Sequence, residues 1–130
     1  MASSQLRELS VSFSVEIIKL CDTVNRHPAL MNQLERAATS IGANIHEANY
    51  AHSRADFIAK LQIALKECFE TEYWLEVFMK AGVIEKVKVN ALFDQCGILR
   101  RMLVASINTA KKNLTDGSSF IKTDNVKDKI

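Results

Sequence analysis

The sequence has little glycine and proline, with four and one respectively in 130 residues. Because β-rich folds use these residues at many tight turns, their scarcity disfavours an all-β fold and favours a few long helices. No run of about 18 apolar residues occurs, so the sequence offers no membrane span. The first residues also lack the basic and apolar regions of a signal peptide. We therefore expect a cytoplasmic protein that makes no membrane contact.

Cysteine is also scarce, and Cys21, Cys68 and Cys96 are odd in number and far apart. They form no C-x-x-C pair and have no zinc-ligand spacing. The Glu-x-x-His pairs of di-iron bundles and the H-E-x-x-H motif are missing as well. We expect reduced cysteines packed in the core, and neither a metal nor another cofactor.

What the sequence does have is helical periodicity. Apolar residues recur at spacings of three and four in four segments, each bounded by a proline, a capping residue or a glycine. The predicted helices span residues 4–25, 29–50, 54–81 and 85–114. Their short links predict an all-α, antiparallel up-down-up-down four-helix bundle over residues 1–114. Residues 115–130 are mostly polar and predict a flexible C-terminal tail.

A polar stripe runs along the second predicted helix. The stretch RAATSIGANIHEANYA, residues 36–51, consists largely of small and apolar residues. At about 100° per residue, its main polar side chains fall on one stripe beside the apolar face. The stripe consists of Arg36, Ser40, Asn44 and Glu47. These side chains form either a structural network or a site.

The third predicted helix also has a charged residue in an unexpected place, because Glu72 lies on its apolar face. An isolated buried carboxylate is costly, so it needs a partner, and Arg36 is the natural candidate. We therefore expect Glu72 to complete a structural polar network with the stripe. The alternative is an enzyme that uses Glu47, Glu70 or Glu72 together with Arg36.

The third predicted helix also carries apolar bulk away from its core face. Ile63, Trp74 and Phe78 lie about 80° to 140° from the centre of that face. A second apolar surface on a bundle helix predicts a partner, and a second copy of the chain is the commonest one. The alternative is that Trp74 is covered by the tail or by a neighbouring loop.

Positive charge is concentrated in the fourth predicted helix. Residues 85–114 hold six basic and two acidic residues, whereas the whole chain has a net charge of only +2. Five of these basic residues fall on one flank of the fourth helix, within about 120°. They are Lys86, Arg100, Arg101, Lys111 and Lys112. Such a flank either follows the phosphates of a nucleic acid or is an ordinary solvated face.

Extended to residue 75, the polar stretch has a family resemblance. RAATSIGANIHEANYAHSRADFIAKLQIALKECFETEYWL resembles the bacterial four-helix bundle proteins related to the 23S rRNA intervening-sequence protein. Their pattern is roughly R-A-A-x-S-I-P-A-N-I-A-E-G followed by F-L-x-x-L-x-I-A-L-x-S-x-x-E-L-E. Two positions depart from it, because Gly42 replaces the family's proline and Ala48 its glycine.

The resemblance implies an antiparallel bundle that assembles as a ring-like homopentamer and is not an enzyme. A related branch, the accessory proteins of diversity-generating retroelements, looks like a basic pentameric barrel that works with a reverse transcriptase and nucleic acid. We therefore expect a self-associating bundle that binds RNA or DNA, or a nucleic-acid-handling protein, through its basic flank. A protein-only scaffold or adaptor is the alternative.

Overall fold

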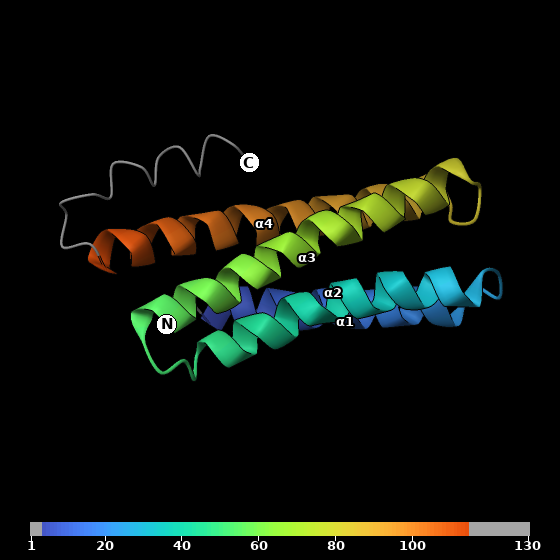
Figure 1. Ribbon diagram of the computed structural model, residues 1–130. Helices are drawn as coiled ribbons and strands as arrows, with labels where there is room; N and C mark the ends of the chain where they lie inside the picture. The colour runs from blue at the N-terminus through green and yellow to red at the C-terminus, as the bar shows by residue number, and fades with distance from the viewer. Residues whose placement is uncertain (1–3, 115–130) are drawn as a thin grey trace.

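Four antiparallel helices form the described part of the protein (Figure 1). The computed structural model describes residues 4–114, so the predicted tail at 115–130 lies outside the described residues. The helices are α1 (Ser4–Asp22), α2 (Pro28–Ala48), α3 (Arg54–Lys80) and α4 (Lys86–Leu114). The α1–α2 and α3–α4 turns lie at one end and the α2–α3 link at the other (Figure 1). The predicted all-α bundle is confirmed.

The turn between α1 and α2 follows from its local sequence. Pro28 is the first helical residue of α2, where its fixed φ suits a helix and its missing N–H costs nothing. His27 before it adopts a left-handed conformation, with φ 53° and ψ 56°. α1 ends at Asp22, short of the predicted end at Asn25. The Thr23 hydroxyl donates to the Leu20 carbonyl at 2.7 Å, a local bond that competes with continuing the helix.

Both ends of α3 are capped as the sequence predicts. The Ser53 hydroxyl accepts a hydrogen bond from the Asp56 N–H at 3.0 Å, and the Asp56 carboxylate accepts one from the His52 N–H at 3.3 Å. The first bond satisfies a backbone donor that the first turn of a helix leaves free, and the second fixes the residue before the cap. After the other end, Gly82 has a φ of +73°, the left-handed region in which glycine is unstrained.

A continuous apolar core fills the bundle between the four helices. Its largest fully buried side chains are Phe13, Phe78, Leu6, Ile17, Leu34, Ile41, Ile45, Leu61, Leu75, Leu99, Leu103 and Ile107. The apolar spacing of the second predicted helix also places Leu30 in the core, and this prediction is wrong, because Leu30 is 41% exposed while Met31 beside it is only 4% exposed. Leu30 lies in the first turn of α2, at the end of the bundle, where a helical stripe leaves the core.

Gly42 brings α1 and α2 close together. A Cβ atom placed on it would lie 3.2 Å from the Ser10 hydroxyl oxygen of α1, closer than ordinary packing allows. Ser10 is itself only 1% exposed, and its hydroxyl donates to the Arg7 carbonyl. Glycine costs about 1 kcal/mol in a helix interior, but here it permits the close approach of two backbones.

The four seams between neighbouring helices differ in the extent of their contact. The contact between α2 and α3 is the most extensive, and that between α1 and α4 is the least extensive. Two hollows of about 300 and 340 Å³ follow the α1–α4 seam and share Glu16 and Gln95 in their linings. Within residues 4–114, no helix combines the length and apolar character that crossing a membrane requires.

Candidate functional site

The predicted pairing of Arg36 with Glu72 is wrong. Arg36 Nη2 donates to Glu70 Oε2 at 2.5 Å, and Arg36 Nη1 lies 3.7 Å from Glu67 Oε1. The reason is the helical angle, since residues two apart in sequence point about 160° away from each other. Glu70 therefore faces α2, whereas Glu72 faces α4. The hydrogen bond to Glu70 raises the pKa of Arg36 above its ordinary value.

Trp74 lies beside Arg36 and Glu70 on the α2–α3 seam. Its indole N–H donates to Glu70 Oε2 at 3.4 Å, so Glu70 accepts from both Arg36 and Trp74. The ring packs beside Phe78, with centroids 5.9 Å apart and planes 26° apart. Trp74 is partly buried and packs against the apolar core.

The remaining members of the predicted polar network act separately. Glu47 pairs with Lys60 of α3 at 3.1 Å, and this pair is exposed. Asn44 donates its amide N–H to the Ser40 carbonyl at 2.9 Å, a bond within α2. The five predicted residues therefore fall into separate groups and do not form one network.

Glu72 pairs instead with Arg100 of α4. Arg100 Nε lies 3.2 Å from Glu72 Oε2, and the two side chains are only 21% and 17% exposed. The prediction that Glu72 needs a cationic partner is correct, but the partner comes from α4. The guanidinium carbon of Arg100 also lies 5.9 Å from the centroid of the Phe69 ring, a cation–π contact.

The residues of the predicted basic flank have different surroundings. Arg100 is held by Glu72, whereas Lys86 and Arg101 are exposed. Lys111 and Lys112 lie in the last turn of α4 and have interactions of their own. A Cβ atom placed on Gly97 would lie 3.3 Å from Arg101 Nη1 and 3.6 Å from Arg100 Nη2. The two guanidinium groups thus converge over Gly97.

The predicted interface residues also differ from one another. Ile63 is 41% exposed, and its role at an interface stays a prediction. Phe78 is 1% exposed, so its prediction as an interface residue is wrong. The ring belongs to the apolar core, and Trp74 of the same helix stacks beside it. Trp74 keeps only part of its surface open.

Sequence reasoning missed the aromatic side chains that α3 does expose. Phe69 is 44% exposed and Tyr73 is 58% exposed. The same helical-angle calculation places them about 100° and 140° from Cys68, on the flank opposite Trp74 and Phe78. The signal was present in the sequence, but nothing in it showed which flank of α3 is covered.

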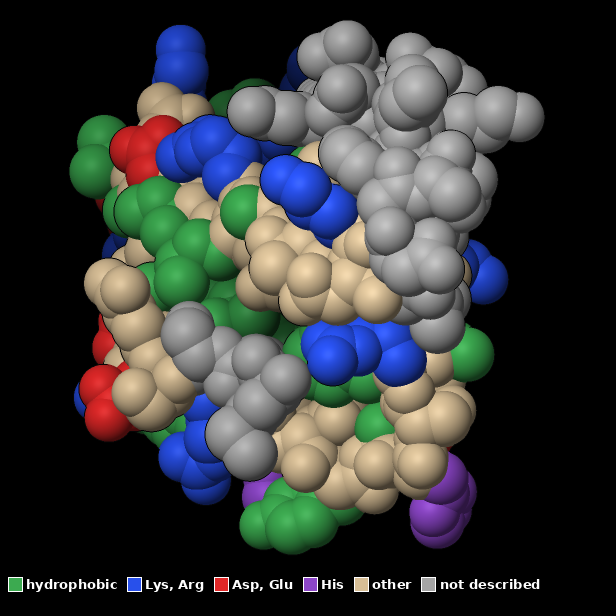
Figure 2. Space-filling model, turned by 90° about the vertical axis from the view of Figure 1, so that its left-hand side faces the viewer, with side chains coloured by type: hydrophobic (Ala, Val, Ile, Leu, Met, Phe, Trp, Pro, Cys, Tyr) green, Lys and Arg blue, Asp and Glu red, His purple; other side chains and the backbone are tan. Residues whose placement is uncertain are grey.

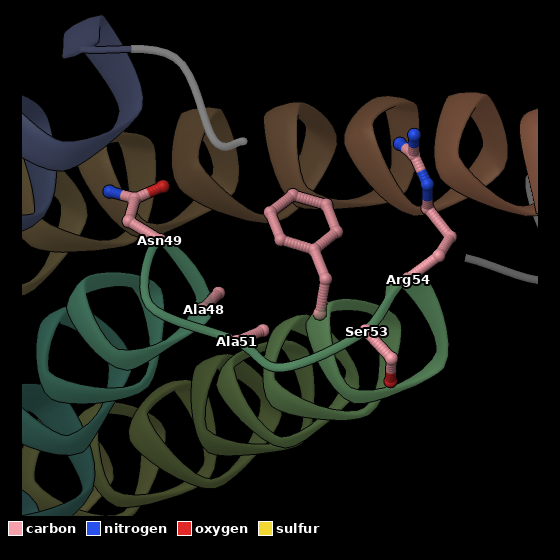
Figure 3. Close-up of a pocket in the computed structure, with 6 residues that line it drawn as sticks. Ala48, Asn49, Ala51, Ser53 and Arg54 are labelled. Atoms are coloured by element: carbon pink, nitrogen blue, oxygen red, sulfur yellow. The ribbon is translucent and has the colours of Figure 1, made fainter.

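Two hollows lie at the end of the bundle where α3 begins, and both include Arg54 and Phe57. One, of about 230 Å³, is lined by residues of the α2–α3 link (Figure 3). The other, of about 360 Å³, reaches the last turns of α4. In Figure 3, the Arg54 and Asn49 side chains project to the same side of the link, and Ser53 projects to the other. No glutamate lines either hollow.

The three cysteines are free thiols. Cys96 Sγ donates to the Cys68 carbonyl at 3.6 Å, and both residues are fully buried between α3 and α4. Hydrogen bonding with Cys96 and burial raise the pKa of Cys68. Burial, together with the nearby Glu35 carboxylate, raises the pKa of Cys21 to about 12. Within residues 4–114, no cluster of His, Cys, Asp and Glu side chains is arranged to hold a metal ion.

Fold and polar contacts together define an all-α antiparallel four-helix bundle in which charged pairs join α3 to both of its neighbours, α2 and α4. A family model described as 23S rRNA-intervening sequence protein matches residues 3–105. The chain belongs to this family, and the predicted resemblance is confirmed. The match includes Lys86, Arg100 and Arg101 but ends before Lys111 and Lys112.

A solved structure gives the same assignment. It is the crystal structure of a protein of unknown function from the S23 ribosomal protein family of Bacteroides thetaiotaomicron. The two chains are 38% identical with a TM-score of 0.74, and the alignment covers 78% of this chain and 97% of the other. No match was found among curated proteins. Neither the family nor this neighbour is described by an enzymatic activity.

Proposed function

We propose that this protein is a non-enzymatic, self-associating bundle that binds nucleic acid, or a protein that handles nucleic acid, through the outer flank of α4. The homopentamer is the assembly that the family resemblance implies. The observation that carries the proposal is the convergence of Arg100 and Arg101 over Gly97. Only Glu72 neutralises this pair, and within residues 4–114 no carboxylate forms an ion pair with Arg101.

An excess of guanidinium groups suits a phosphate backbone. Arginine stays protonated at all physiological pH values and presents several N–H donors that match phosphate oxygens. Lys86 lies on the same flank of α4 and is exposed. Lys and Arg side chains are also more visible than Asp and Glu on the end where α4 finishes (Figure 2). In a symmetric oligomer each copy would repeat this charge.

The contacts of the glutamates support a non-enzymatic role. Glu47, Glu70 and Glu72 each pair with a cation, namely Lys60, Arg36 and Arg100 respectively. A general acid or base works from a concave site that admits substrate. The glutamates instead lie along helix seams, where their ion pairs join neighbouring helices.

An apolar stripe on the outer face of α1 supports self-association. Val11, Val15 and Ile18 are 48%, 42% and 40% exposed. Their spacing of four and then three places them on one line, opposite the face that α1 buries. α1 and α3 occupy diagonal positions in the bundle, so Ile63 of α3 lies on a different outer surface. Two different apolar surfaces permit the head-to-tail contacts of a ring.

The same stripe favours a second function, that of a protein-only scaffold or adaptor. In that case Val11, Val15 and Ile18 would carry the activity, and the α4 flank would be an ordinary solvated surface. The two functions make opposite predictions for nucleic acid, because a scaffold would not bind it even at low salt.

Binding of labelled RNA and DNA at rising salt concentration tests the nucleic-acid role. The affinity should fall steeply with salt, and Arg101→Ala should weaken binding and reduce the slope by about one. Arg36→Ala is the matched control, because Arg36 is 49% exposed but lies on α2, diagonally across the bundle from α4, where Glu70 already pairs with it. No binding at low salt by an intact oligomer would leave the scaffold as the function.

Light scattering tests self-association. Val15→Glu places a charge at the centre of the α1 stripe and should dissociate the oligomer. Leu30→Glu is the control, since Leu30 is 41% exposed but lies in the first turn of α2, away from the stripe. A wild-type protein that stays monomeric at high concentration would contradict the homopentamer.

A further inference from the structure

Phe69 and Tyr73 place two exposed rings on one face of α3. They are four residues apart, so they lie about one helical turn from each other on the same line. Their exposed fractions are 44% and 58%, whereas the other aromatic residues of α3 are buried or partly buried. Tyr73 also meets Trp74 edge-on, with ring centroids 5.0 Å apart and planes 75° apart. This contact restricts how Tyr73 can turn while its outer face stays open.

The rings lie beside the positive charge of α4. The Arg100 guanidinium lies over the Phe69 ring at 5.9 Å and is oriented by Glu72. Arg101 approaches the same point above Gly97, where the missing side chain leaves space for both groups. Aromatic faces and guanidinium groups from two helices therefore form one continuous surface, which we call the α3–α4 face: Phe69, Tyr73, Arg100 and Arg101.

We propose that the α3–α4 face binds single-stranded nucleic acid, with bases stacked on Phe69 and Tyr73 and phosphates bound by Arg100 and Arg101. This inference rests on the proposed function and narrows its ligand. Exposed rings stack on the faces of unpaired bases, whereas a duplex hides those faces between its own base pairs. Guanidinium groups beside the rings bind the linking phosphates and can themselves stack on bases.

The charge of this face argues against a second copy as its occupant. Two copies meeting here symmetrically would bring four guanidinium groups and only two Glu72 carboxylates together. Like charges in contact are unfavourable, and phosphates remove the excess. Glu72 has a positioning role, because it holds Arg100 over Phe69. It does not bind phosphate itself, since its own negative charge would repel one.

The test compares a labelled oligouridylate with an RNA duplex of the same length at low salt. Wild-type protein should bind the single strand more tightly than the duplex. Phe69→Leu and Tyr73→Leu keep apolar bulk but remove the ring face, and each should weaken single-strand binding by on the order of ten-fold. Tyr50→Leu is the matched control, because Tyr50 is 73% exposed but lies after α2, away from this face.

The variants also separate this inference from the proposed function. If Arg101→Ala weakens binding but both leucine variants bind normally, phosphates alone carry the interaction and the stacking site is wrong. Equal affinity for duplex and single strand would overturn it in the same way. If no RNA or DNA binds at low salt, the direct nucleic-acid binding of the proposed function fails as well. If the leucine variants dissociate the oligomer, the face is a protein interface and the inference is wrong.

Discussion

The two flanks of α3 use the same kinds of side chain with opposite results. Toward α2, a single guanidinium, Arg36, meets two carboxylates, Glu67 and Glu70. Toward α4, two guanidinium groups, Arg100 and Arg101, converge over Gly97, and the single carboxylate of Glu72 pairs with Arg100. The first flank has one more carboxylate than guanidinium and so has no unpaired positive charge, whereas the second has an excess of positive charge.

The aromatic residues follow the same division. Toward α2, Phe78 is buried and Trp74 is partly covered, and the Trp74 N–H is bonded to Glu70. Toward α4, Phe69 remains 44% exposed beneath Arg100. A surface is thus available for binding where positive charge exceeds negative charge and an aromatic ring is exposed. The comparison makes the α2 flank structural and the α4 flank the candidate site.

The largest expected effect separates the two phenylalanines. Phe78→Ala removes a ring that is 1% exposed, so it should lower the free energy of unfolding by about 3–5 kcal/mol. Phe69→Ala removes a ring that is 44% exposed and should cost less than about 1 kcal/mol. Urea unfolding followed by circular dichroism measures both. Equal losses would contradict the assignment of Phe69 to the surface.

A smaller effect concerns the ion pair on the α4 flank. Glu72→Ala leaves Arg100 partly buried without its carboxylate, which should cost about 1–3 kcal/mol of unfolding free energy. A double-mutant cycle with Arg100→Ala isolates the interaction between the two side chains. Glu76→Ala is the control, because its pair with Lys80 is exposed and lies within one helix. A cycle with no coupling energy would mean that the pair does not hold α3 to α4.

Arg36→Leu should cost less, despite the two carboxylates beside Arg36. The Arg36 side chain is 49% exposed, and exposed ion pairs contribute only about 0.2–1 kcal/mol because water and salt screen them. The loss should shrink as salt is added, when unfolding is measured at low and high ionic strength. A loss that is larger and independent of salt would place Arg36 in the interior of an oligomer. Glu8→Gln is the control, because it changes an exposed charge on α1, away from Arg36, Glu67 and Glu70.

A further effect appears only at alkaline pH and concerns the thiols. The pKa of Cys21 is raised from 9.0 to about 12, so unfolding releases a proton in this range. This contribution to stability is fully present below pH 9 and is lost as pH rises towards 12. It should disappear in Cys21→Ala, as measured by the difference in unfolding free energy across that range.

Thiol reagents report on the same burial. Cys68 and Cys96 are sealed beneath the α4 flank and should react only after unfolding, because buried thiols of raised pKa carry little thiolate. Cys21 is partly buried and should react first as pH rises. Rapid labelling of Cys68 in the folded protein would indicate that the α3–α4 seam opens.

Much of the fold could be predicted because its determinants are local. Pro28 starts α2, Ser53 and Asp56 start α3, and Gly82 follows its end, each through its own backbone geometry or a nearby hydrogen bond. Apolar spacing then identified most buried faces. The departures, at the end of α1 and at Leu30, occur at helix ends, where one hydrogen bond or the loss of a neighbour decides the outcome.

The candidate site was less predictable, because it depends on which helix lies on which flank. The helical angle places Phe78 and Phe69 at similar distances from the centre of the buried face of α3, about 80° and 100° on opposite sides. Only the packed structure buries the first and exposes the second. It likewise directs Glu70 to Arg36 and Glu72 to Arg100.

The sequence by itself determined four helices, their caps, their apolar faces and the positive charge of the last one. These properties depend on spacing and on contacts within a few residues. The tertiary structure alone decided the partner of each charge and the exposure of each ring, because these depend on residues distant in sequence. The contact between Arg100 and Phe69, separated by a turn and much of two helices, is such a case.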